Sequence, residues 1–118
     1  MAQGTYQIHP LSGSTNFLPI NIAAINATSP TLIHESSAVN YDELWLSAYC
    51  YGASDTALYL MFGSDVPHQQ MSLVVPSQRG LISIVNGLRF TGGVTISAYA
   101  SNTNSISIIG SVNRIVFV

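Results

Sequence analysis

The sequence contains no lysine, and charged residues of either sign make up only 7% of its 118 residues. Soluble domains contain about 25% charged residues on average. Lysine on exposed edge strands is one of the main ways in which β proteins prevent their sheets from pairing with neighbouring chains. A β-rich chain without lysine either covers its edges or uses them, so we expect a small domain that functions within an assembly.

Other scarcities exclude further classes of protein. The net charge of −2 provides no basic surface for a phosphate backbone, so we expect no nucleic-acid partner. Cys50 is the single cysteine, which excludes an intrachain disulfide framework, and we expect its side chain to be a small buried hydrophobe. No apolar run approaches the ~18 residues that a membrane-spanning helix needs, so we expect no membrane partner.

The residues that usually carry chemistry are scattered along the chain. Three histidines have no His, Cys or acidic partner at metal-ligand spacing, and we expect them on the surface or in loops: His9, His34 and His68. Asp42 and Glu43 are adjacent, and neighbours in a strand point to opposite faces, so they cannot act there as an acid–base pair. We therefore predict no catalytic residues, no metal, no cofactor and a protein that is not an enzyme.

A period-two alternation of apolar and polar residues runs through most of the chain, interrupted by turn residues at short intervals. It predicts strands over residues 17–25, 31–35, 42–51, 56–63, 69–75, 80–85, 93–100 and 105–117. No segment shows the 3.6-residue stripe of a helix longer than a single turn. The fold class is therefore all-β, namely a two-sheet antiparallel β-sandwich of about eight strands that is jelly-roll-like.

The first sixteen residues differ from the rest. They predict an extended N-terminal arm (residues 1–16) in front of a single β-sandwich domain (residues 17–118). Apolar side chains recur along and just after this segment, and they are candidate interface residues: Tyr6, Ile8, Leu11 and Phe17. They are too few to form a core of their own, so we expect contact with a neighbouring subunit or another partner surface to order the arm.

Two pairs of consecutive strands are separated by short loops and predict hairpins. Near the C-terminus, the alternation pairs Ala100 with Ile106 and Ala98 with Ile108 around a five-residue loop. The other hairpin joins Leu44–Tyr51 to the strand that ends at Phe62, and its register stays open.

This second hairpin carries more apolar side chains than one core face needs. The surplus residues are further interface candidates: Trp45, Tyr49, Tyr51, Tyr59 and Met61. They could pack against another layer or a subunit, where tyrosine and tryptophan are enriched, or they could form a platform on which sugars stack. We favour packing, because no cluster of acids or amides that would bind sugar hydroxyls adjoins them in the sequence.

Four segments carry a resemblance to a known family: Ile8–Ser14 (IHPLSGS), Asp42–Leu46 (DELWL), Val75–Leu81 (VPSQRGL) and Gly110–Ile115 (GSVNRI). The chain resembles a family of small proteins found among the structural genes of tailed bacteriophages, including cyanophages. This family is similar to capsid cement or decoration proteins. The resemblance implies a small β-sandwich, often trimeric, that lies outside the phage head and clamps neighbouring capsomers.

The resemblance and the composition together give one leading hypothesis. It is a non-enzymatic virion protein that assembles with itself, as a trimer, and binds the major capsid protein on the capsid exterior. It would be made in the cytoplasm of the host bacterium, which suits a chain without cysteine pairs. Two alternatives stay open, namely a tail, baseplate or fibre component and a carbohydrate-binding module.

Overall fold

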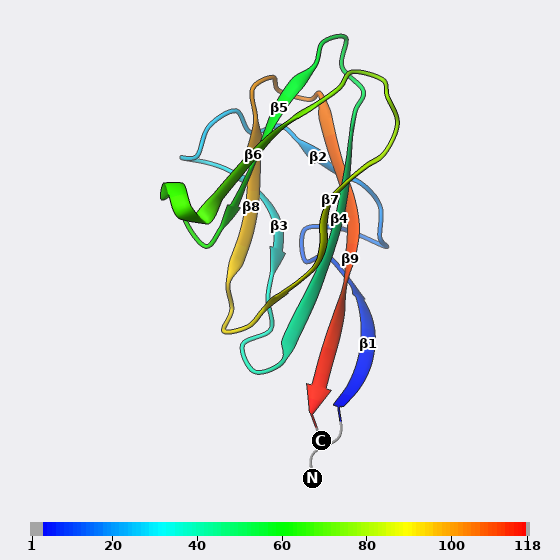
Figure 1. The fold of residues 1–118 in the computed structure, drawn as a ribbon, viewed down its shortest axis with the longest axis vertical. Coiled ribbons are helices and arrows are strands. Elements are labelled where there is room, and N and C mark those ends of the chain that lie inside the picture. Colours follow the sequence, from blue (N-terminus) through cyan, green and yellow to red (C-terminus); the bar gives the residue numbers. More distant parts are fainter. Residues whose placement is uncertain (1–3, 118) are drawn as a thin grey trace.

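A computed structural model describes residues 4–117 as an all-β, two-sheet antiparallel sandwich (Figure 1). Sheet A contains β1 (Gly4–Pro10), β2 (Ile20–Ile22), β4 (Tyr41–Cys50), β7 (Ile82–Phe90) and β9 (Ile106–Phe117). Sheet B contains β3 (Thr31–Glu35), β5 (Thr56–Phe62), β6 (Gln70–Val75) and β8 (Thr95–Ala100). The helical content of the described chain is the single 3-10 turn η1 (Pro67–Gln69), and nothing in residues 4–117 forms a helix that could cross a membrane.

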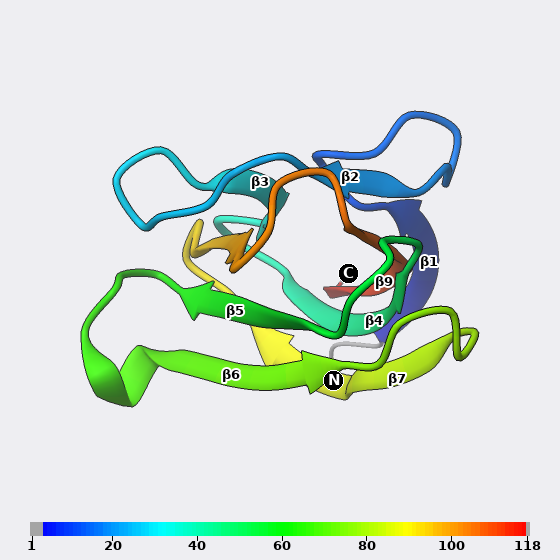
Figure 2. The same cartoon turned by 90° about the horizontal axis from the view of Figure 1, so that it is seen from above.

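The strand order confirms the jelly-roll-like topology. Sheet A runs β1-β9-β4-β7, with β2 also paired to β9, and sheet B runs β3-β8-β5-β6. From β2 onwards each strand crosses to the other sheet, except that β5 and β6 pair directly. This order is that of a jelly roll, in which two sheets enclose one core. Figure 2 shows β5 and β6 on one side of the molecule and β1 and β9 on the other.

Both predicted hairpins are wrong in their pairing, although the inward-facing residues are correct. Strand β8 pairs with β3 and β5, whereas β9 pairs with β1, β2 and β4. Likewise, β4 and β5 lie in different sheets. Ile96 and Ile108 are nevertheless fully buried in the shared core. A loop of five residues can connect strands within a sheet or between sheets, and the alternation identifies the buried face but not the layer.

The N-terminal segment is part of sheet A. Strand β1 pairs with β9 from Gly4 opposite Phe117 to Pro10 opposite Ser111 (Figure 1), which corrects the expected separate arm. The physical reason is that β9 extends well beyond the short strand β2, so the remaining part of its edge is free to bind β1. The part of the predicted arm before Gly4 lies outside the described residues.

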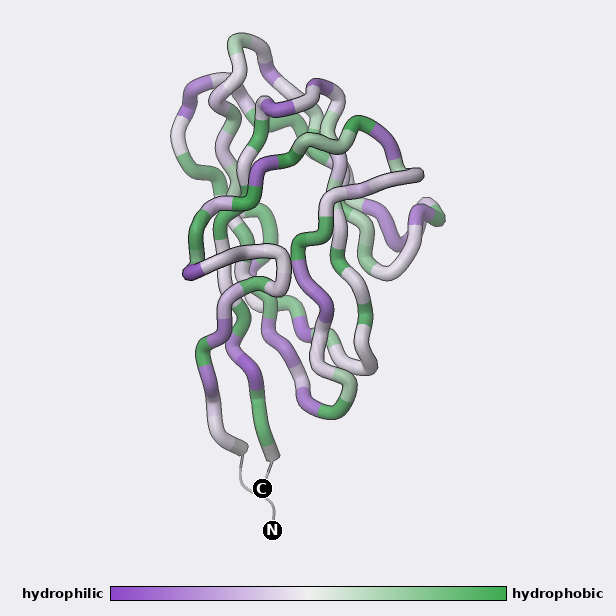
Figure 3. The backbone as a smooth tube through the Cα atoms, turned by 180° about the vertical axis from the view of Figure 1, so that it is seen from behind, coloured by the Kyte–Doolittle hydropathy of each residue, from purple (hydrophilic) through white to green (hydrophobic). Residues whose placement is uncertain are grey.

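The core follows from the alternation along each strand, which is visible as changing hydropathy along the backbone (Figure 3). In β4, the inward residues Leu44, Leu46 and Ala48 are buried, whereas Trp45 between them is on the outer face. Cys50 ends this buried row and is 2% exposed, as predicted. The outer faces of the sheets are therefore the surfaces available to a ligand or a partner.

Candidate functional site

The structure divides the predicted interface residues between opposite sides of the molecule. Six of them lie on or beside the outer face of sheet A: Tyr6, Ile8, Phe17, Trp45, Tyr49 and Tyr51. Tyr59 and Met61 lie on the outer side of β5 in sheet B. The two sets therefore cannot form one continuous contact surface.

Two of the predicted interface residues are corrected, because the chain buries them itself. Leu11 is 1% exposed and belongs to the hydrophobic core, because the chain folds inward directly after β1. Met61 is 4% exposed. Beside it, the half-buried ring of Tyr59 stacks on Tyr99 with their centroids 4.6 Å apart. Part of the apolar surplus of this strand is thus used within the chain.

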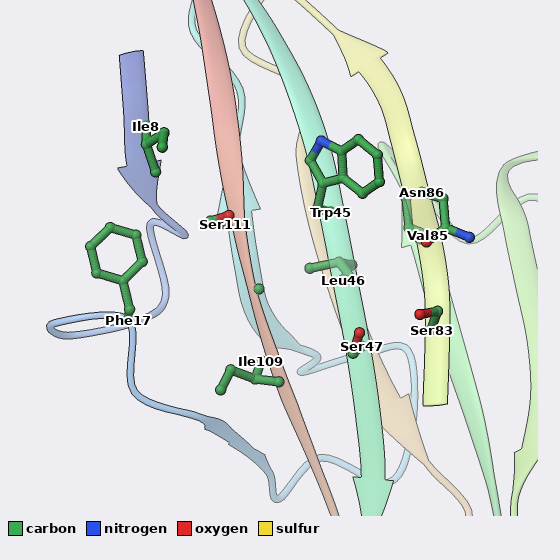
Figure 4. A pocket seen from close by; sticks show the side chains of 11 residues that line it. Ile8, Phe17, Trp45, Leu46, Ser47, Ser83, Val85, Asn86, Ile109 and Ser111 are labelled. Atoms are coloured by element: carbon green, nitrogen blue, oxygen red, sulfur yellow. The ribbon is translucent and has the colours of Figure 1, made fainter. Parts of the chain in front are cut away.

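A shallow groove of about 510 Å³ crosses the outer face of sheet A (Figure 4). We call it the indole groove, and its lining residues are Ile8, Phe17, Trp45, Leu46, Ser47, Ser83, Val85, Asn86, Ile109, Gly110 and Ser111. Trp45 leans from β4 towards β7 on one side, and Ile8 and Phe17 lie beyond β9 on the other. The indole groove therefore combines side chains from β1, the loop before β2, β4, β7 and β9.

The orientation of Trp45 is fixed by its neighbours. Its Nε1 donates a hydrogen bond to Glu43 Oε1 over 3.0 Å. This bond and a second from Asn113 lower the pKa of Glu43, with a smaller contribution from the Arg89 guanidinium. The Trp45 ring also packs on Gly87, where a β-carbon would lie 3.1 Å from the ring. Gly87 lies at a register shift between β4 and β7. Its φ of +79° is in the left-handed region, which favours glycine.

The floor of the indole groove includes Gly110 of β9. Gly110 allows β9 to pass close to β4, since a β-carbon there would lie 2.1 Å from the Trp45 carbonyl oxygen. Four polar side chains surround this floor: Ser47, Ser83, Asn86 and Ser111. Within residues 4–117, these four side chains make no hydrogen bond to another protein group. Three of them come from β7 and β9, and strand order, which the sequence does not reveal, brings them next to Trp45.

A second hollow of about 520 Å³ lies near the end of β4. We call it the tyrosine hollow, and it is lined by Tyr49, Cys50, Tyr51, Gln78, Gly80 and Leu81. The Tyr49 and Tyr51 rings are 6.5 Å apart, and the Tyr51 hydroxyl donates a hydrogen bond to Asn21 Oδ1. Leu81 is exposed at its edge. This hollow is thus more apolar than the indole groove.

A cluster of polar side chains, which we call the polar corner, joins the two sheets and consists of the buried residues His34 and Asp42, the partly buried Arg114 and the exposed Ser12. Asp42 Oδ1 accepts a hydrogen bond from Arg114 Nε over 2.7 Å, and Oδ2 accepts bonds from Arg114 Nη2, His34 Nε2 and the Ser37 amide. Burial alone would raise the pKa of Asp42, but these hydrogen bonds outweigh it and hold the pKa at about 2. The carboxylate is therefore ionised at neutral pH.

Ser12, His34 and Asp42 lie in the order found in hydrolase triads. The Ser12 hydroxyl lies 3.0 Å from His34 Nδ1, and His34 Nε2 lies 2.8 Å from Asp42. The Ser12 amide also donates to Nδ1, so Nε2 carries the ring proton. A hydrolase needs free amide groups near its serine to bind the developing oxyanion. Here the amides of Ser12, Gly13 and Ser14 already donate to groups of the chain. The geometry therefore suits a structural role, in which these hydrogen bonds hold the segment after β1, strand β3 and strand β4 together.

His34 corrects the expectation that the histidines lie on the surface or in loops. It is 2% exposed on β3, because its bonds to Asp42 and Ser12 satisfy both ring nitrogens in the interior. Among the described residues, no group of three or more His, Cys, Asp or Glu side chains could hold a metal ion. No family model, curated protein or solved structure matches this chain.

Proposed function

We propose that the protein is a non-enzymatic structural protein of a tailed-bacteriophage virion. Its role is that of a capsid cement or decoration protein, which forms a trimer on the head exterior and binds the major capsid protein. The observation that supports this proposal best is the pair of exposed apolar surfaces on opposite sides of the sandwich. One is the tyrosine hollow of sheet A, and the other surrounds Tyr59 on sheet B.

These two surfaces have more apolar area than a solitary sandwich requires. The outer face of an antiparallel sheet that meets only water is mainly polar. Here Tyr51 and Leu81 are exposed beside the tyrosine hollow, and Leu32 and Val74 are exposed on sheet B. Exposed apolar patches mark sites of protein contact. Two opposite patches suit a subunit that binds another copy through one face and the capsid through the other.

The free edge of β1 provides further support for assembly. Strand β1 has β9 as its one partner, so alternate backbone N–H and C=O groups of Gly4–Pro10 point away from the sheet. None of these seven residues is an Asp, Glu, Lys or Arg. Edges of this kind bind other chains unless charge or proline blocks them, and the single proline here is the last residue of the strand.

The proposal is tested by labelling the protein on intact virions and by measuring its oligomeric state. We expect the label on the head, and light scattering should show a trimer. Tyr49→Asp and Tyr59→Asp each introduce a charge into one surface, and an unpaired charge at a buried contact costs several kcal/mol. One substitution should yield monomers, and the other should leave trimers that no longer bind capsids.

Val39→Asp is the matched control, because Val39 is highly exposed in the loop before β4. It should change neither assembly nor capsid binding. A label on the tail would favour a tail or fibre component. A wild-type monomer at micromolar concentration, or the absence of label from virions, would contradict the proposal.

A further inference from the structure

We propose that the indole groove is a binding site for a neutral saccharide. One sugar ring would stack on the exposed face of Trp45, and its hydroxyl groups would bind the polar side chains around the floor. This site does not depend on the proposed capsid role, because the groove is complete within one chain.

Trp45 supplies the apolar contact that such a ligand needs. Its side chain is 42% exposed although it lies in the middle of sheet A, and Phe17 on the opposite side of the groove is 43% exposed. The C–H face of a sugar ring is apolar, whereas its hydroxyl groups point outward around the ring. An exposed indole beside polar groups matches both features.

The polar groups of the groove are free to bind such hydroxyls. Ser47, Ser83 and Ser111 each offer a hydroxyl that both donates and accepts, and Asn86 offers an amide. These side chains have no protein partner in the described chain, so a ligand would not have to displace an internal hydrogen bond. The sequence alone shows no polar cluster beside Trp45, and the pairing of β4 with β7 and β9 creates it.

The site is preorganised. The bond from Trp45 to Glu43 and the contact with Gly87 hold the indole in place before a ligand arrives. Glu43 is itself held by Asn113 and lies 3.8 Å from Arg89. Groups that are already ordered lose less conformational entropy on binding, which favours affinity.

The chemistry of the groove favours a neutral sugar over other ligands. None of its lining residues is charged, so nothing there would offset the charge of a phosphate or carboxylate. A peptide strand lying in the groove could not pair with the backbone of β4 or β9 beneath it, because both strands already have partners on both sides. Its volume of about 510 Å³ is in the range of sites for small ligands.

The chain contains its own reporter for the test, because Trp45 is its single tryptophan. The isolated protein is titrated with glucose, maltose, lactose and cellobiose while Trp45 emission is recorded. We expect a saturable change with at least one of these sugars. Ser83→Ala and Asn86→Ala should each weaken that sugar about threefold to tenfold, the value of one hydrogen bond. Trp45→Ala should abolish binding, which is then measured by calorimetry because the variant has no tryptophan emission.

Ser72→Ala is the matched control, because Ser72 is an exposed strand serine that lies opposite Tyr59 on sheet B. It should bind the sugar as the wild type does. Thermal unfolding of each variant is measured to check that the variant is folded. The proposal is overturned if no sugar gives a saturable change, or if Ser72→Ala weakens binding as much as Ser83→Ala. It is also overturned if the wavelength of the Trp45 emission maximum shifts on dilution of the protein alone, since a second copy then covers the groove.

Failure of this test leaves the capsid proposal intact, since labelling of virions does not involve the groove. Conversely, a protein that is absent from virions but binds maltose would retain the saccharide site. The two proposals can therefore fail separately.

Discussion

Strand β4 contributes to both the polar corner and the indole groove, and the two regions treat their polar groups in opposite ways. Asp42 points inward and accepts four hydrogen bonds from Arg114, His34 and Ser37. On the outer face, Ser47 points into the groove and has no protein partner in the described chain. Satisfied buried groups hold a fold together, whereas free polar groups beside an exposed aromatic ring are available for a ligand.

Asp42→Ala in the polar corner is expected to have the largest effect on stability. Removing the carboxylate leaves the buried His34 ring and the partly buried Arg114 guanidinium without their shared partner. Breaking a fully buried ion pair costs about 3–5 kcal/mol, and we expect the lower end of this range because Arg114 is partly exposed. Urea unfolding should show this loss in the free energy of unfolding.

Asp65→Ala is the matched control, because it makes the same substitution at an aspartate in an exposed loop before η1. It should change stability by less than about 0.5 kcal/mol. If both substitutions had similarly small effects, the polar corner would not be a stabilising element and the comparison would fail.

The next effect is the response of the polar corner to acid. The pKa of Asp42 is about 2 in the folded chain and about 4 in an unfolded one. The stabilisation from this group is therefore fully present above about pH 4 and is lost as the pH falls towards 2. A shift of this size corresponds to about 2–3 kcal/mol. Urea unfolding at a series of pH values should show the decline.

Asp42→Asn isolates this contribution, because the amide keeps the shape of the side chain but does not titrate in this range. Its stability should fall less than that of the wild type between pH 4 and pH 2. Equal slopes for the two proteins would show that other carboxyl groups cause the decline.

Much of the fold can be predicted from the period-two alternation. It predicts a strand over residues 31–35, and β3 spans Thr31–Glu35. It identifies Ile96 and Ile108 as core residues although they lie in different sheets. The pairing of strands cannot be predicted in the same way, because a short loop suits a hairpin and a crossing between sheets equally well. Strand β1 is missed because Thr5, Gln7 and His9 make its segment resemble a polar terminus.

The functional regions show the same limit. Trp45 is identifiable in the sequence as an aromatic on the outer face, but Ser83 and Asn86 adjoin it only through the pairing of β4 with β7. His34 and Asp42 are eight residues apart and belong to different sheets, so their bond follows from the packing of one sheet on the other. Local patterns predict which face a side chain occupies, and tertiary packing decides its neighbours.

The smallest effect compares two serines with opposite roles. Beside the polar corner, Ser36 is 4% exposed and its Oγ accepts a hydrogen bond from the Val94 amide over 2.8 Å. Ser36→Ala leaves that amide without a partner and should cost about 1–3 kcal/mol. Ser83→Ala in the indole groove removes no internal bond and should stay within about 0.5 kcal/mol of the wild type. Thermal and urea unfolding measure both changes. An equal loss from the two substitutions would mean that the fold already uses the Ser83 hydroxyl, which would then not be free for a ligand.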